Sequence, residues 1–420
     1  MKNLSSFYLS ELLQRNIYDE YGYCIGKLVD IYVTTGDGYP KAIGYKVKKG
    51  SEIYNHEFRN IEFYNEDGKV LIKVRGVKDI MPRAYSYLLS KNLLDKQIVD
   101  VNGKKVVRVN DLRIASISSE IRVIAVETGF LALSRRYGID KIVNFLCKVF
   151  KRQPNNKIIM WDDVESLEMI DHNLKISVPY KKISELHPAD IADILEEVDS
   201  KYRNKIFESL DKDLAAETLE EINPEIQVDI LETMNQSKVS EILNNMSNDE
   251  IADILEELDE DTAEKLLINL DSEDVEKVRD LMKYEEETVG SVMSTEFLSF
   301  NVNITTGETI ELLKELQAED KISHYIYITD QSERLEGVIS LNELILSNAS
   351  TKLKDIMETE VIKLNDDEKL DSAMAKFVKY DLITMPVIDG DEKLQGILFI
   401  TDIIEEMFPQ IGKKKLKRAV

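Results

Sequence analysis

The central quarter of the chain, residues 185 to 290, repeats with a period of twelve residues. Counted in windows from Ile191, positions 1, 4, 5 and 8 are apolar at 28 of 32 places, which is the spacing of one face of an amphipathic helix. One continuous helix is excluded, because at about 100° per residue twelve residues turn the apolar stripe by roughly 120°. Position 9 instead carries preferred N-cap residues, namely Asp199, Asp211, Asn223, Asn235, Ser247, Asp259 and Asp271. The repeat therefore predicts about eight short helices that bury their apolar faces by stacking as a small solenoid.

This block also carries nearly all of the negative charge of the chain. Residues 185 to 290 hold 9 basic and 33 acidic groups, a net charge of -24. Residues 1 to 184 are basic at +8, and residues 291 to 420 are acidic at -9, so that the whole chain has a net charge of -25. A block of such charge must be solvated, repelled by acidic neighbours or neutralised by cations. An ordinary solvated helix face accounts for most of its carboxylates.

The remaining composition limits the class of protein. A length of 420 residues predicts several domains, and no apolar run approaches the 18 or so residues that a membrane helix needs. The two cysteines, Cys24 and Cys147, cannot build a disulfide framework, and the first residues lack an apolar signal region. These features predict a globular chain in a reducing cytoplasm.

The C-terminal part of the sequence is an internal duplication. Residues 292 to 302 resemble residues 356 to 364, and Ile310 to Ile328 align with Leu370 to Ile388. Each copy predicts the order strand, helix, strand, strand, helix. The predicted helices are Thr309 to Leu316 and Leu370 to Tyr380, and the predicted strands are Tyr325 to Thr329, Gly337 to Ser340, Met385 to Asp389 and Gly396 to Ile400.

The N-terminal part is duplicated as well, at an offset of 81 residues. Leu12 corresponds to Leu93, Gly22 to Gly103 and Asp30 to Asp111. Short alternating or β-branched runs between glycines and Asn or Asp predict small β-barrels. The predicted strands are 25 to 33, 42 to 47, 70 to 74, 106 to 114, 121 to 126 and 174 to 178. Residues 135 to 152 interrupt the second copy with an amphipathic helix, which either packs on its own barrel or contacts a partner or membrane surface.

Several of these segments resemble known families. Met385-Pro-Val-Ile-Asp389 and Leu394-Gln-Gly-Ile-Leu398 resemble a pair of cystathionine-β-synthase (CBS) domains, which are regulatory ligand-binding modules. Together with the solenoid, the runs from Leu186 to Asp193 and from Tyr284 to Met293 resemble the cytosolic part of MgtE magnesium channels. That resemblance covers residues 185 to about 406. The opening run, from Leu12 to Ile31, resembles the PRC-barrel, a module also found in ribosome-maturation factors.

The predicted fold is therefore a multidomain α+β chain, with small PRC-barrel-like β-barrels, a central all-α superhelical solenoid and a C-terminal CBS pair. In the MgtE family a helix after the second CBS domain leads to a transmembrane pore, whereas this sequence ends in a basic tail, so we expect the sensor without the channel. The predicted domains are two PRC-barrel-like domains (1–80 and 81–184), the solenoid (185–287), the two CBS domains (288–348 and 349–408) and the basic tail (409–420).

The resemblance also implies a cation site between the acidic solenoid and the acidic CBS face. Two carboxylates about 4 Å apart repel by roughly 1 kcal/mol in water, and Mg²⁺ between them would turn repulsion into cohesion. For each candidate the alternative is a solvated or helix-capping carboxylate. The residues implied are Glu217, Asp249 and Asp253 in the solenoid and Asp371, Asp381, Asp402 and Glu405 in the second CBS domain.

CBS pairs often bind adenine nucleotides, but this sequence departs from that pattern. Leu382 stands where an adenine-stacking aromatic residue is expected, and Asn342-Glu343 stands where the family has Arg-Asp. ATP binding is therefore doubtful, and Glu343 is the one residue that would take part in it.

The sequence thus predicts a cytoplasmic, non-enzymatic regulator that senses Mg²⁺. It is expected to form a homodimer through its CBS domains and to control a separate membrane transporter or another partner, with peripheral attachment to the inner face of the membrane as a further option. Two alternatives stay open: a ribosome- or RNA-associated adaptor that works through the barrel half, and a scaffold with a degenerate sensor. Nucleic-acid binding is disfavoured, because the basic residues of the barrel half are scattered.

Overall fold

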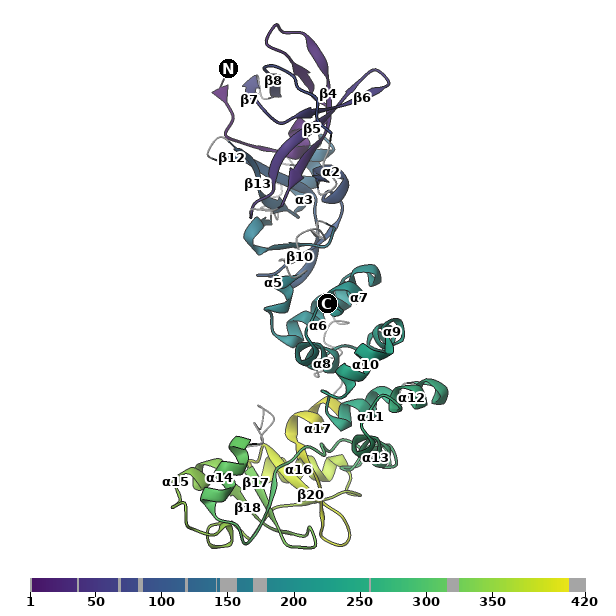
Figure 1. Cartoon of the computed structure of the whole chain (residues 1–420), viewed down its shortest axis with the longest axis vertical. Helices are drawn as coiled ribbons and strands as arrows, with labels where there is room; N and C mark the ends of the chain where they lie inside the picture. Colours follow the sequence, from purple (N-terminus) through teal and green to yellow (C-terminus); the bar gives the residue numbers. More distant parts are fainter. Residues whose placement is uncertain are drawn as a thin grey trace. The chain divides into compact units, whose positions relative to one another are not determined.

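The computed structural model describes residues 2–35, 38–66, 69–81, 86–117, 120–140, 142–143, 157–168, 180–256, 258–315 and 325–407. The predicted strand 174–178, residues 144–152 of the predicted inserted helix and the basic tail 409–420 lie outside these ranges. The chain divides into two compact units, Met1–Leu210 and Asp211–Val420, whose elements are labelled in Figure 1. Among the described helices, none combines the length and the apolar character needed to cross a bilayer.

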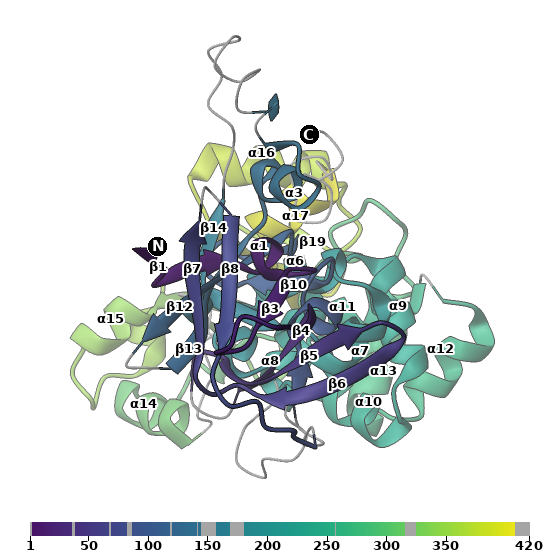
Figure 2. The ribbon, with the colours of Figure 1, turned by 90° about the horizontal axis from the view of Figure 1, so that it is seen from above.

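The first unit is built on a sheet of twelve strands that draws on both N-terminal copies (Figure 2). Its main path runs β1-β7-β8-β3-β4-β5-β13-β12-β2, while β6 pairs with β5, β9 with β4 and β14 with β13. Strands β10, β11 and β15 form a second, smaller sheet. The strands are β1 (Lys2–Asn3), β2 (Ser6–Tyr8), β3 (Asn16–Tyr18), β4 (Cys24–Thr34), β5 (Lys41–Lys49), β6 (Glu52–Glu57), β7 (Ile61–Glu66), β8 (Lys69–Val74), β9 (Tyr87–Leu88), β10 (Gln97–Asp100), β11 (Lys105–Arg108), β12 (Asp111–Ile117), β13 (Glu120–Glu127), β14 (Ile158–Met160) and β15 (Val164–Ser166).

The two copies exchange their first strand and helix. Strand β2 of the first copy pairs with β12 of the second, and β9 of the second pairs with β4 of the first. Each strand leads into a one-turn helix, α1 (Leu9–Leu12) or α2 (Leu89–Asn92). One continuous core, which includes Leu9, Leu28, Leu89 and Leu112, runs through both copies.

A buried aspartate fixes each exchanged helix from the opposite copy. Asp111 accepts hydrogen bonds from the Ser10 backbone N (3.1 Å) and Oγ (2.5 Å), and Asp30 accepts them from the Ser90 N (2.8 Å) and Oγ (2.5 Å). Both carboxylates are almost fully buried. The sequence correspondence of Asp30 and Asp111 thus marks a reciprocal contact between the copies.

The helical repeat follows the predicted period. The helices are α6 (Pro188–Glu197), α7 (Ser200–Phe207), α8 (Lys212–Glu220), α9 (Pro224–Thr233), α10 (Gln236–Leu243), α11 (Asn248–Glu256), α12 (Glu260–Leu267) and α13 (Ser272–Leu281). The cap side chains of Asp211, Asn223, Asn235 and Asp259 accept hydrogen bonds from backbone N–H groups of the helices they precede. Helices α6 and α7 fall in the first unit, together with the short helices α3 (Phe130–Arg136) and α5 (Lys181–Ser184).

Within the second unit the helices pack on their second neighbours. Helix α8 contacts α10, and α11 contacts both α9 and α13. This spacing buries the apolar stripes of α8 to α13, as the amphipathic pattern predicted.

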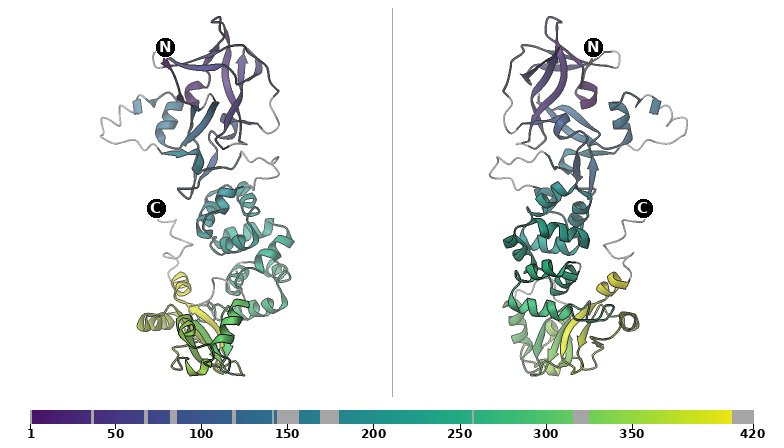
Figure 3. Two further views of the ribbon diagram at one scale, coloured as in Figure 1. Left: turned by 60° about the vertical axis from the view of Figure 1, so that its left-hand side comes forward. Right: turned by 90° about the vertical axis from the view of Figure 1, so that its right-hand side faces the viewer.

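The rest of the second unit is the predicted duplicated module (Figure 3). Each copy has a three-stranded sheet in which the first strand is parallel to the second and the third is antiparallel to it. The strands are β16 (Ser299–Asn301), β17 (Tyr325–Thr329) and β18 (Leu335–Ser340), and β19 (Leu364–Asn365), β20 (Thr384–Ile388) and β21 (Leu394–Phe399); the helices are α14 (Thr306–Glu315), α15 (Leu341–Leu346), α16 (Leu370–Tyr380) and α17 (Ile400–Met407).

Candidate metal centre

The N-terminus of α11 lies against the segment that enters the CBS pair. The Asn248 side-chain amide donates to Thr295 Oγ1 at 3.2 Å, and Ser294 Oγ donates to Asp249 Oδ1 at 3.2 Å. Ser294 in turn exchanges two backbone hydrogen bonds with Ile397 of β21, at 2.8 and 2.9 Å. Asp249 is therefore held where the helical repeat meets the second CBS copy.

Strand β21 leads directly into α17, and the first turn of that helix carries Asp402. The Asp402 carboxylate accepts a hydrogen bond from the Phe399 backbone N at 3.2 Å, so the side chain folds back over the start of the helix. Such a position also favours a negative charge, because the N-terminal N–H groups of a helix point toward it. Asp402 is partly buried.

The pKa of Asp249 is raised to about 7. Burial is the largest cause, and the charges of Asp402 and Glu296 add to it, while a hydrogen bond from Ser294 acts in the opposite direction. The charges of Asp402 and Glu296 thus disfavour the ionised form of Asp249. A cation that neutralised them would favour the charged form of Asp249.

The three carboxylates do not form a closed cage. Within the described ranges, no three or more His, Cys, Asp or Glu side chains are grouped tightly enough to hold a metal ion. A Mg²⁺ ion that kept several of its waters would need only one or two carboxylates.

The other predicted ligands lie on the surface around this point. Asp253 follows Asp249 by one turn of α11 and is exposed, and Glu405 follows Asp402 by three residues of α17 and is partly buried. Both helical spacings place the second acid near the face of the first.

Three further candidates are exposed, one on α8 and two at the ends of α16. Glu217 lies on α8, Asp371 lies in the first turn of α16, and Asp381 is the residue that ends α16, at a left-handed φ of 54°. No hydrogen bond or ion pair is recorded for any of these three side chains within the described part of the chain. Their role as ligands stays a prediction.

Sequence reasoning missed Glu296. It lies in the run Met293-Ser-Thr-Glu296, which the duplication had marked only as a repeated segment. The usable signal was its position, a few residues after the acidic helical repeat ends. Its backbone N donates to Ser294 Oγ at 3.3 Å, which holds this connection in a turn.

Glu343, the one residue nominated for nucleotide binding, has a structural role at the start of α15. Its carboxylate accepts a hydrogen bond from the Ser340 backbone N at 3.0 Å, and its own N–H bonds to Ser340 Oγ at 3.2 Å. This is a capping box. The capping box uses one oxygen of the Glu343 carboxylate. Nucleotide binding by Glu343 stays a prediction.

Comparison with known families agrees with the predicted modules. Family models match the MgtE intracellular N domain over residues 186–287, the CBS domain over 289–348 and 353–409, and the PRC-barrel domain over 5–81. The magnesium transporters MgtE of Enterococcus faecalis and Thermus thermophilus are 34% and 30% identical over 128 residues, which is 30% of this chain. The chain spans 28% of the length of each of these relatives.

Two solved structures resemble the C-terminal half in fold. A crystal structure of the cytosolic domain of the Mg²⁺ channel MgtE in complex with ATP has a TM-score of 0.51 and 29% identity, and covers 53% of this chain and 91% of its own. The soluble part of a magnesium transporter gives the same TM-score and identity, and covers 55% and 91%. The chain therefore joins an MgtE intracellular N domain and a pair of CBS domains to a preceding PRC-barrel domain.

Proposed function

We propose that this protein is a Mg²⁺-responsive regulator in which a hydrated cation binds between α11 and α17. The observation that carries the proposal is the raised pKa of Asp249, which lies within the electrostatic influence of Asp402 and Glu296. Loss of the cation leaves three mutually repelling carboxylates at one contact. Magnesium concentration would therefore control how firmly the helical repeat holds to the CBS pair.

Asp249, Asp402 and Glu296 would act through the inner waters of the ion or as single direct ligands. Asp253 and Glu405, one turn further along their helices, extend the same acidic faces. Oxygen ligands of this kind favour Mg²⁺ and Ca²⁺ over softer metals. Glu217, Asp371 and Asp381 are proposed as additional cation contacts, since all three are exposed.

A Mg²⁺ titration followed by small-angle scattering and calorimetry tests this proposal. Wild-type protein should become more compact as Mg²⁺ is added, and the D402N variant should respond only at higher concentrations. D391N removes an exposed carboxylate of the same domain and serves as the matched control. Unchanged scattering across the titration, or equal responses of D402N and D391N, would contradict the proposal.

The output of such a sensor requires a partner. We propose that the chain is cytoplasmic, dimerises through its CBS pair and controls a separate membrane transporter, with attachment at the inner face of the membrane. Affinity capture from cells grown with and without Mg²⁺, divided into membrane and ribosome fractions, separates this from the ribosome-associated alternative. Enrichment of a transporter that depends on Mg²⁺ supports the proposal, whereas recovery with ribosomes in both conditions contradicts it.

ATP is not expected to act on this protein, although the structural relative named above was solved with ATP. Leu382 offers no aromatic ring for stacking, and Asn342 stands where a cation beside the phosphates is expected. We predict no change in melting temperature on adding ATP in Mg²⁺-free buffer. A saturable upward shift would show that the CBS pair has retained a nucleotide site.

A further inference from the structure

A small pocket of about 230 Å³ opens where the two N-terminal copies meet. Its wall combines β2 of the first copy, β12 of the second and the edge of the hairpin β7–β8. Strands β2 and β12 are hydrogen-bonded neighbours, with Arg113 opposite Tyr8 and Ala115 opposite Ser6. The pocket therefore lies within one unit and on a seam that exists only because the copies exchange strands.

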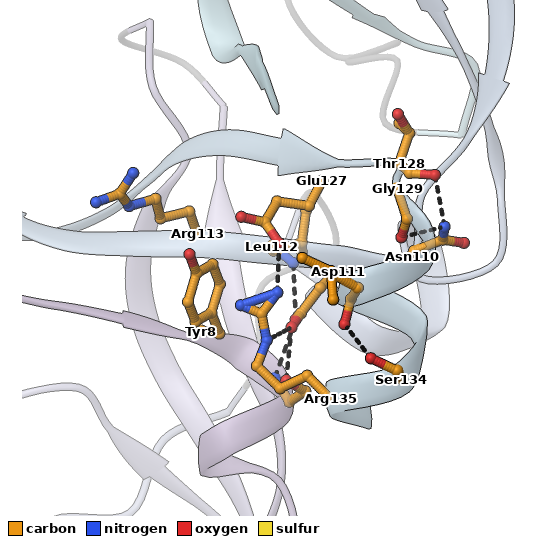
Figure 4. A network of polar contacts seen from close by, with 12 residues as sticks. Tyr8, Asn110, Asp111, Leu112, Arg113, Glu127, Thr128, Gly129, Ser134 and Arg135 are labelled. Atoms are coloured by element: carbon orange, nitrogen blue, oxygen red, sulfur yellow. Dashed lines mark hydrogen bonds and ion pairs between the residues drawn. The ribbon is translucent and has the colours of Figure 1, made fainter. Parts of the chain in front are cut away.

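The guanidinium group of Arg113 is the strongest binding feature of this pocket. Its Nε donates to Ser6 Oγ at 3.3 Å, and within the described residues its two terminal nitrogens donate to no acceptor. In Figure 4, Arg113 extends away from the buried network around Arg135. A guanidinium that is positioned through Nε and open at both Nη atoms matches the two oxygens of a carboxylate or phosphate.

The other charged groups of the pocket favour the same kind of ligand. Lys69 also lines the pocket and has no ion-pair partner among the described residues. The one acidic residue of the lining, Glu11, already accepts a hydrogen bond from the Tyr8 backbone N at 3.0 Å as part of the α1 cap. Positive charge therefore exceeds negative charge, and Phe7 and Val70 add an apolar surface.

We propose that this pocket binds a small anion through a phosphate or carboxylate group, with Arg113 as the bidentate contact and Lys69 as a supporting charge. The site is separate from the proposed cation site, because it lies in the first unit and uses none of its residues. Binding would connect β2, β12 and the β7–β8 hairpin, and so would stabilise the exchanged arrangement of the two copies.

Calorimetric titration of the full chain in metal-depleted, chelator-free buffer tests the proposal with two probes, inorganic phosphate and succinate. Binding of phosphate alone identifies a phosphate site, and binding of succinate alone identifies a carboxylate site. R113Q should weaken the preferred anion at least about tenfold, and R113K should bind with intermediate affinity because it keeps the charge but not the fork. K69Q should weaken binding less than R113Q, and K352Q, an exposed lysine of the CBS pair, should bind as wild type.

Hydrogen exchange supplies a second readout that does not depend on the variants. The bound anion should slow amide exchange in β2 and β12 of the wild-type protein, while exchange in the CBS strands stays unchanged. The proposal is overturned if neither anion binds at about 10 mM, or if folded R113Q and R113K bind as the wild type does.

Discussion

Single polar residues explain the places where the helical repeat departs from its apolar pattern. Gln227 stands at position 1 of its window, is buried and donates from Nε2 to the Leu219 carbonyl at 2.7 Å. Arg203 stands at the same position of an earlier window and donates from Nε to the Leu195 carbonyl at 2.9 Å. Both acceptors lie eight residues back, in the last turn of the preceding helix, where carbonyls have no partner within the helix. The sequence could flag these exceptions, but only the helix stacking shows which carbonyl each one satisfies.

The carboxyl group of Asp249 should make the stability of the folded protein depend on pH. Its pKa is raised to about 7 in the folded protein from an ordinary value of 3.8, so the folded state holds a proton that the unfolded chain has lost. In metal-free buffer, stability should therefore fall as the pH rises from about 4 through 7 and then level off. Mg²⁺ bound at the proposed site would compete with this proton, so its affinity should rise over the same range.

Chemical denaturation at several pH values checks this dependence. D249N should remove most of the fall, whereas D253N, an exposed acid one turn away, should retain it. An equal slope for D249N and the wild type would contradict the assignment.

At the scale of elements, helix α3 supplies a charge that the second N-terminal copy requires. Asp30 lies opposite Lys46 in the first copy, but the corresponding pair in the second copy is Asp111 and Glu127, two buried carboxylates. Arg135 of α3 compensates: it bonds to Glu127, and its Nε lies 3.5 Å from Asp111 Oδ2 (Figure 4). Its Cζ also lies 3.4 Å from the centre of the Tyr8 ring, a cation–π contact.

Replacing Arg135 with leucine should destabilise the first unit by about 3–5 kcal/mol, because two buried carboxylates lose their cation. Denaturant unfolding measures this loss. The double variant R135L/E127Q should recover part of it, since one of the two charges is then removed. R136L, which removes an ion pair with the exposed Asp95, is the control and should cost about 1 kcal/mol or less.

The sequence predicted some elements closely and others only in outline. The spans of β17 and α16 agree with prediction, and so do four of the seven predicted caps of the repeat, because short-range spacing and capping determine them. Asp199 and Asp271 precede their helices as predicted but make no side-chain cap bond. The exchange of β2 and β9 could not be read from the sequence, because the same alternating strand pattern fits pairing within a copy or between copies. For the same reason, the sequence could not predict that Arg135 neutralises Asp111 and Glu127.

At the scale of the whole molecule, several large apolar side chains of the CBS pair are exposed in the described part of the chain. Ile345 and Leu346 at the end of α15 are 70% and 78% exposed, and Val378 of α16 is 72% exposed. Exposed apolar groups on the surface of a module are typical of an interface. These exposed groups support the proposed dimer. The predicted domain boundaries are a separate matter and stay predictions.

The variant I345E/L346E should shift the protein from dimer to monomer in light scattering coupled to gel filtration, because burying the new charges is costly. I268E changes a similarly exposed isoleucine, 81% accessible at the end of α12, and should leave the dimer intact. A wild-type chain that is monomeric at micromolar concentration, or a dimer that tolerates both glutamates, would rule out this interface.

The reciprocal bonds of Asp30 and Asp111 have a consequence for how the N-terminal half folds. Neither copy can complete its hydrogen bonds before the other has formed, because each supplies the carboxylate that receives the other's helix. These contacts span 101 residues between Ser10 and Asp111 and 60 residues between Asp30 and Ser90, and such non-local contacts slow folding. The duplicated half should accordingly unfold in one cooperative transition, and during refolding the amide hydrogens of both copies should become protected from exchange at the same time.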